Sequence, residues 1–184
     1  MDNPTDKRVP RSIFVIILAI FASMYYYAAF VDLAEPEETV TRFYQAYFAK
    51  DFDTVADNVS VFWSLQLLPH YGTLTPSQLL ENREFIEKET SFALKRTEEK
   101  NEIPDNISIK IMRNYTREED ICSVVLYTFL EDNKPTGVGM AILVQEEGQY
   151  RIYNLSRIDT EDLPRVKEID LQGLSQSFKD LYKL

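Results

Sequence analysis

An uncharged apolar run from Ser12 to Val31 sets the first limit on the fold. It holds 20 residues and reads IFVIILAIFASMYYYAAFV after the serine. A helix of this length measures about 30 Å, which is the thickness of the hydrocarbon core of a bilayer. A buried helix in a soluble domain is seldom so long and so uniformly apolar. The run therefore predicts a transmembrane helix over residues 12–31.

The charges on either side of this run predict its orientation. Basic residues stand before it and acidic residues follow it, so the positive-inside tendency places residues 1–11 in the cytoplasm and the rest of the chain outside. We therefore expect a single-pass protein of the cell membrane with an extracytoplasmic C-terminal domain. The charged residues are Lys7, Arg8 and Arg11 before the run and Asp32, Glu35, Glu37 and Glu38 after it.

A cleaved signal peptide is the alternative to an uncleaved anchor. Signal peptides have an apolar region of about 7 to 15 residues that ends in small residues at the cleavage site. The run is longer than this, and Tyr27 precedes the nearest small pair, Ala28 and Ala29, at a position where a small residue is needed. These features favour an uncleaved anchor and leave cleavage open.

The composition predicts one ordered domain after the apolar run. Of the 184 residues, 45% are hydrophobic and 12% are aromatic, which is enough for one well-filled core. The formal net charge of −10 would repel phosphate backbones, so we expect no nucleic-acid partner. The single cysteine, Cys122, lies in a strand-like run, which predicts a small buried side chain.

Apolar spacing predicts helices in the first half of the domain, after a short linker at residues 32–36. One stripe follows the i, i+3, i+4 pattern of an amphipathic helix that begins at Pro36 and consists of Val40, Phe43, Tyr44, Tyr47 and Phe48. The segment DTVADNV predicts a short second helix capped by Asp53, and Thr75 before Pro76 starts a surface helix that runs to about Arg96. Between them, β-branched and aromatic residues predict a strand within Val59–Leu68.

Four strand-like runs make up most of the second half: ISIKIMRNYT, ICSVVLYTFLED, GVGMAILVQEE and YRIYNLSRI. The turns REED, DNKPTG and EEGQ separate them and are short enough for an antiparallel meander. The fold class expected is therefore α+β, with helices covering one face of an antiparallel sheet.

This order of elements over residues 37–158 resembles the nuclear-transport-factor-like superfamily, also described as a cystatin-like cone. The opening stretch ETVTRFYQAYFAKDFDTVADNV is similar to the first helix pair of that superfamily. The resemblance implies a cone-shaped domain in which a curved sheet packs on helices. Residues 159–184 extend beyond the cone as a helical tail that either packs on the domain, which we favour, or binds a partner; its apolar stripe is Leu174, Phe178, Leu181 and Tyr182.

The superfamily includes isomerases and hydrolases that place an acid, a tyrosine or a histidine in the open end of the cone. By this resemblance, the candidates for lining such a pocket are Tyr44, Trp63, His70 and Tyr127. His70 is the only histidine and cannot form a multi-histidine metal site. Phosphate-binding and calcium-binding loop patterns are absent from the sequence, so we assign no catalytic residue, metal or cofactor.

These observations favour a membrane-anchored binding and assembly module without enzymatic activity. The architecture resembles the bitopic subunits of bacterial type IV secretion and conjugation channels. The expected partners are the membrane, through residues 12–31, and other proteins of a membrane assembly, with further copies of the chain as an alternative. Two other functions stay open: an enzyme or small-molecule carrier that uses the cone pocket, and a structural scaffold whose tail helix makes the contacts.

Overall fold

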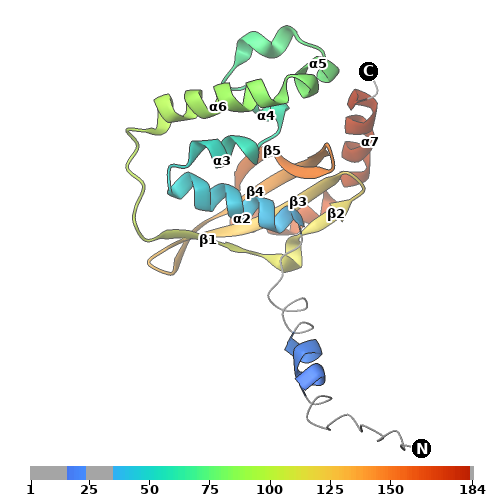
Figure 1. Ribbon diagram of the computed structural model, residues 1–184. Helices are drawn as coiled ribbons and strands as arrows, with labels where there is room; N and C mark the ends of the chain where they lie inside the picture. The colour runs from blue at the N-terminus through green and yellow to red at the C-terminus, as the bar shows by residue number, and fades with distance from the viewer. Residues whose placement is uncertain (1–15, 24–34, 183–184) are drawn as a thin grey trace, which may run out of the picture. The chain divides into compact units, whose positions relative to one another are not determined.

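The computed structural model describes residues 16–23 and 35–182. The chain divides into two compact units, Met1–Ala34 and Glu35–Leu184. We refer to the second unit as the domain. It contains every strand of the described structure and the helices labelled in Figure 1.

In the N-terminal unit, residues 16–23 form a helix. Within the described segments, no helix is long and apolar enough to cross a membrane. The structure therefore contradicts the expected transmembrane helix and the single-pass location that depended on it, while the membrane partner stays a prediction. Residues 12–15 and 24–31 of the predicted span lie outside the described residues.

The domain begins with the predicted amphipathic helix, α2 (Glu35–Phe48). Its apolar stripe buries Val40, Phe43 and Tyr44 against the sheet, which confirms the periodicity. The chain then turns at Lys50, which adopts a left-handed backbone conformation (φ 56°), into α3 (Phe52–Asp57). Asp51 caps this helix by accepting a hydrogen bond from the Thr54 amide, so the prediction of Asp53 as the cap is wrong.

The strand predicted within Val59–Leu68 is also wrong. Only Val59 forms a single parallel bridge, to Ile152, and the chain continues as α4 (Val61–Ser64) and the short 3-10 helix η1 (Pro69–Thr73). The side chain of Ser60 accepts a hydrogen bond from the Phe62 amide and so caps α4. A helix cap and packing of apolar side chains therefore override the β propensity of this segment.

The predicted surface helix is present as two helices. Thr75 and Gln78 form a reciprocal capping box at the start of α5 (Pro76–Glu81), and α6 (Arg83–Glu98) follows after a break at Asn82. α6 packs on α3 and α4, so its outer face points away from the sheet (Figure 1).

Each of the four strand-like runs contains a strand, as predicted, but Arg113–Tyr115 of the first run forms the 3-10 helix η2. The strands are β1 (Ile107–Ile111), β3 (Cys122–Glu131), β4 (Lys134–Glu146) and β5 (Gln149–Ile158), which pair antiparallel in this order. A short additional strand, β2 (Arg117–Glu119), lies within the predicted REED turn and pairs with β3. Register shifts at Phe129/Leu130 and Ile142/Leu143 interrupt the ladders, which is typical of bulges that bend a sheet.

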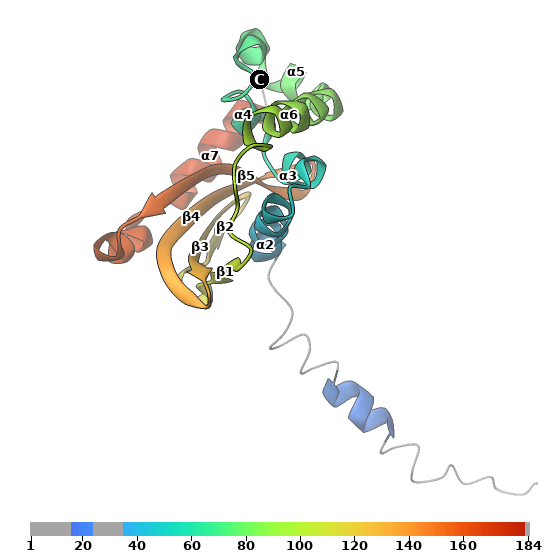
Figure 2. The ribbon, with the colours of Figure 1, turned by 90° about the vertical axis from the view of Figure 1, so that its left-hand side faces the viewer.

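Helical segments cover both faces of the curved sheet, whereas the sequence predicts cover on one face only (Figure 2). Val125 and Tyr127 of β3 point to the cluster that contains α2. Their neighbours Val124 and Leu126 point to the opposite face, which is covered by the C-terminal segment, η3 (Thr160–Glu168) and α7 (Leu171–Tyr182). The domain is thus α+β with the sheet between two layers of helices.

Candidate functional site

The interior between α2 and the sheet is filled by aromatic side chains. The hydroxyl oxygens of Tyr44 and Tyr127 lie 2.5 Å apart, and Phe129 meets both rings edge-on. Burial raises the pKa of Tyr44 to about 12 and also raises the pKa of Tyr127. Both phenols are therefore protonated at neutral pH and bonded to each other, and neither lines the grooves described below.

The four residues expected to line a cone pocket do not share one site. Tyr44 and Tyr127 are in contact, and Trp63 of α4 is partly buried against the same core. His70 lies instead in η1 at the surface, where its side chain is 61% exposed. The structure therefore brings three of the four candidates into one cluster and places the only histidine of the sequence elsewhere.

A buried charged cluster joins α4, α6 and β4. The Glu146 carboxylate accepts hydrogen bonds from Arg83 and from the hydroxyl of Ser60 (2.5 Å), and Arg83 also pairs with Glu87 at 3.1 Å. Burial raises the pKa of Glu87, while its bond to Arg83 opposes that shift. Because the partners of Glu146 are internal, this cluster holds elements together and offers no free group for chemistry.

The tail residues predicted to pack or to bind a partner pack on the domain. Phe178 lies on Cys122 and Val144 at the back of the sheet, and its ring meets Tyr153 edge-on. Leu174, Leu181 and Tyr182 join the same cluster, and Cys122 is buried as predicted. The tail helix therefore does not offer this stripe as a free surface.

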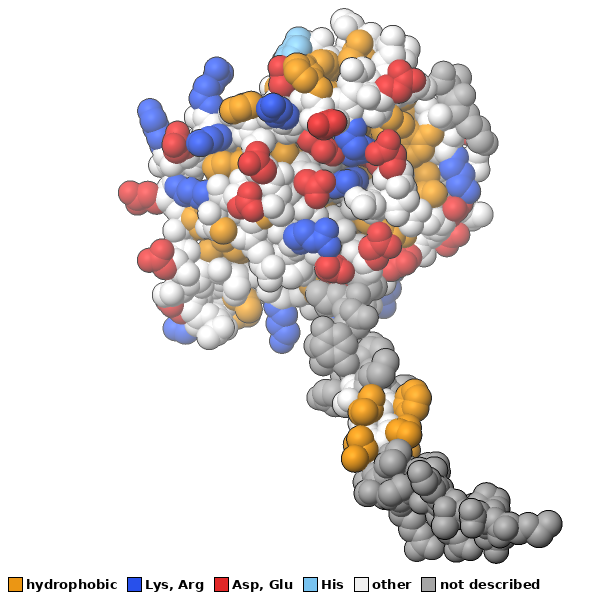
Figure 3. Space-filling view, viewed as in Figure 1, with side chains coloured by type: hydrophobic (Ala, Val, Ile, Leu, Met, Phe, Trp, Pro, Cys, Tyr) orange, Lys and Arg blue, Asp and Glu red, His pale blue; other side chains and the backbone are white. Residues whose placement is uncertain are grey.

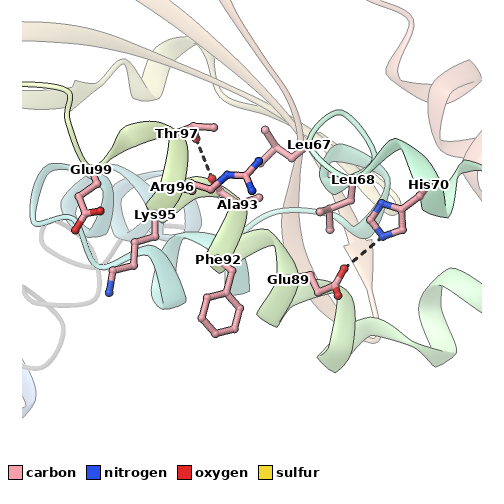
Figure 4. Close-up of a pocket in the computed structure, with 10 residues that line it drawn as sticks. All are labelled: Leu67, Leu68, His70, Glu89, Phe92, Ala93, Lys95, Arg96, Thr97 and Glu99. Atoms are coloured by element: carbon pink, nitrogen blue, oxygen red, sulfur yellow. Dashed lines mark hydrogen bonds and ion pairs between the residues drawn. The ribbon is translucent and has the colours of Figure 1, made fainter.

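The largest groove described here lies between η1 and α6 and has a volume of about 670 Å³ (Figure 4). His70 and Glu89 point toward one another across it, with 3.4 Å between Nε2 and Oε2. The hydroxyl of Tyr71 donates a further hydrogen bond to Glu89 (3.0 Å). The groove is lined by Leu67, Leu68, His70, Glu89, Phe92, Ala93, Lys95, Arg96, Thr97 and Glu99.

Two further grooves follow the same helix. One, of about 460 Å³, lies between α6 and the start of α3, and the other, of about 340 Å³, lies at the start of α6. Four α6 residues stand between or beside these grooves, and we call them the α6 ridge: Phe85, Lys88, Phe92 and Lys95.

The α6 ridge combines exposed aromatic rings with cations. Phe85 and Phe92 are 55% and 65% exposed and are the only large hydrophobic side chains of residues 35–182 recorded as exposed. They are seven positions apart, as are Lys88 and Lys95, so all four share one side of the helix. Figure 3 shows basic, acidic and apolar side chains intermixed on the face that carries α6.

Three acidic side chains around the ridge accept hydrogen bonds, whereas three basic ones form no ion pair among the described residues. Asp51 accepts hydrogen bonds from Thr54, Asp53 accepts one from Ser91 (2.6 Å), and Glu89 is bonded as described above. Three neighbouring cations are exposed and form no ion pair within the described structure: Lys88, Lys95 and Arg96.

The titratable side chains of the largest groove include His70 and Glu89. These side chains are exposed or half-buried. Among residues 16–23 and 35–182, no group of three or more His, Cys, Asp or Glu side chains could hold a metal ion.

Sequence reasoning predicts α6 as a surface helix but does not identify its ridge. The available signal is the seven-residue spacing of Phe85 and Phe92, which separates them from the core stripe of Ile86 and Leu94. No model of a known family, no curated protein and no solved structure matches the chain. The resemblance to the nuclear-transport-factor-like superfamily therefore stays a prediction.

Proposed function

We propose that the domain is a binding module without enzymatic activity, which joins an assembly by contacting another protein through the α6 ridge. The observation that carries this proposal is the pair of exposed phenylalanines set among unpaired cations and grooves on one helix face.

The energetics of aromatic side chains support this reading. Fully burying a phenylalanine side chain stabilises a complex by about 1.5 to 3 kcal/mol relative to leaving it in water. Aromatic and arginine side chains are also enriched among the residues that dominate protein interfaces. Phe92 has such a setting, because the two largest of the three grooves meet at it and leave room for partner side chains.

The alternative functions have less support. An enzyme or carrier would need an open cavity in the cone, and the region between Tyr44 and Tyr127 is filled by their own rings and Phe129. A scaffold that binds through the tail would need a free stripe on α7, and Phe178 is 5% exposed.

Photo-cross-linking from single positions tests the proposal. A photoreactive amino acid replaces Phe92 in the full chain, produced in the cells that normally make it, and the control chain carries it at Gln172, an exposed position of α7. We expect discrete cross-linked species from position 92 and none of these from position 172. The proposal fails if position 92 gives no adduct, or if both positions give the same adducts.

A further inference from the structure

We infer that the partner presents an acidic segment to the α6 ridge, with a large apolar side chain set between carboxylates. This inference rests on the proposed function and names the chemistry of its partner. The apolar side chain contacts Phe92, and the carboxylates pair with Lys88, Lys95 and Arg96.

The cations of the α6 ridge indicate an acidic partner. Lys88, Lys95 and Arg96 lie close together on one helix and form no ion pair in the described structure, although the formal net charge of the whole chain is −10. The nearby acids Asp51, Asp53 and Glu89 already accept hydrogen bonds inside the domain. A carboxylate arriving at the ridge therefore meets cations that form no ion pair within the described domain.

The spacing of the ridge lysines indicates the spacing of the partner's carboxylates. Lys88 and Lys95 are seven residues apart on one helix, which separates their backbones by about 10 Å along its axis. Phe92 lies between them on the same side. A segment that fits this pattern has two carboxylates about 10 Å apart with an apolar side chain between them, which a helix provides at positions about seven apart.

Two acids mark the ends of this basic stretch. Glu84 lines the groove beside Phe85, and Glu99 lines both larger grooves at the end of α6. Neither side chain has a hydrogen bond or an ion pair within the described domain. The carboxylates of the partner are therefore expected between these ends, around Phe92, and not beyond them.

A random peptide library displayed on phage and selected on the full chain tests this inference. We expect selected peptides to be acidic and to contain a large apolar residue. The best peptide is then made twice, once as selected and once with Asp and Glu replaced by Asn and Gln. The amide version should bind at least about tenfold more weakly, because it loses several charge pairs.

Matched variants locate the contact. Lys95→Glu with Arg96→Glu should weaken binding of the acidic peptide by at least about tenfold. Lys110→Glu with Lys134→Glu makes the same charge change at exposed lysines of the sheet and should change affinity by less than about twofold. All four positions are exposed, and circular dichroism checks that each variant keeps its fold.

The results of these binding experiments can contradict the acidic partner alone or the binding surface as well. Selection of neutral or basic peptides that lose binding on Phe92→Ala overturns the acidic partner and keeps the binding surface. Peptides that bind Phe92→Ala and the Lys95→Glu/Arg96→Glu variant as tightly as the unchanged chain overturn both. Self-association of the full chain that Phe92→Ala abolishes would make a second copy the occupant, and so would also overturn the inference.

Discussion

At the residue scale, Gly139 of β4 lies opposite Tyr127 on the neighbouring strand β3. A β-carbon built on Gly139 would overlap the ring of that tyrosine. Gly139→Ala should therefore lower the free energy of unfolding by about 1 to 3 kcal/mol, because the buried ring cannot move without disturbing the core. Urea denaturation of the full chain measures the change.

Gly137, two positions earlier in the same strand, is the matched control. The nearest atom to a β-carbon there is a guanidinium nitrogen of Arg157 at 4.0 Å. Gly137→Ala should leave stability unchanged or slightly higher, since alanine loses less backbone entropy than glycine. Equal effects of the two substitutions would contradict the packing of Tyr127 against β4.

Arg83 and Glu146 form the second residue-scale test. Arg83→Met leaves a carboxylate with no exposed side-chain surface paired only with neutral donors, so we expect a loss of about 3 to 5 kcal/mol in the free energy of unfolding. Adding Glu146→Gln removes the unpaired charge and should restore part of that loss. Purely additive losses in this double-mutant cycle would show that the two residues are not coupled.

At the element scale, α7 is a structural part of the domain. Phe178→Ala should cost about 3 to 5 kcal/mol of the free energy of unfolding, because its buried ring packs on Tyr153 and the back of the sheet. Ser177→Ala, at an exposed position of the same helix, should change stability by less than about 0.5 kcal/mol. A loss as small for Phe178→Ala as for Ser177→Ala would mean that α7 is detached in solution.

The elements also show where local sequence information is sufficient. α2 follows its apolar periodicity because one face is buried along its length, and β3 forms from a run of apolar residues that is buried on both faces. The segment at Val59–Leu68 has a β-rich composition but finds only one strand partner, at Ile152, and so becomes helical after Ser60. That outcome depends on tertiary contacts, which periodicity does not contain.

The candidate site is harder to predict from the sequence than the fold. His70 was a candidate pocket residue, and it does line a groove, but its neighbours there come from α6 and not from the cone interior. Phe85 and Phe92 look like ordinary core residues until it is known which side of α6 packs on α3 and α4. Exposure of a side chain is thus set by packing between elements.

At the scale of the whole molecule, the described domain closes both faces of its sheet and leaves the outer side of α6 as its apolar and basic surface. Aromatic rings fill the interior between α2 and the sheet, and the largest groove lies at the surface beside α6. We therefore base the proposed binding function on the α6 ridge and not on a pocket inside the domain.

Hydrogen-exchange mass spectrometry of the full chain, with and without the selected acidic peptide, tests the location of this contact most directly. We predict slower amide exchange in fragments that cover residues 67–70 and 88–99, since the peptide would shield both walls of the largest groove. Protection confined to strands β3, β4 and β5, or no protection at saturating peptide, would contradict the α6 ridge as the binding surface.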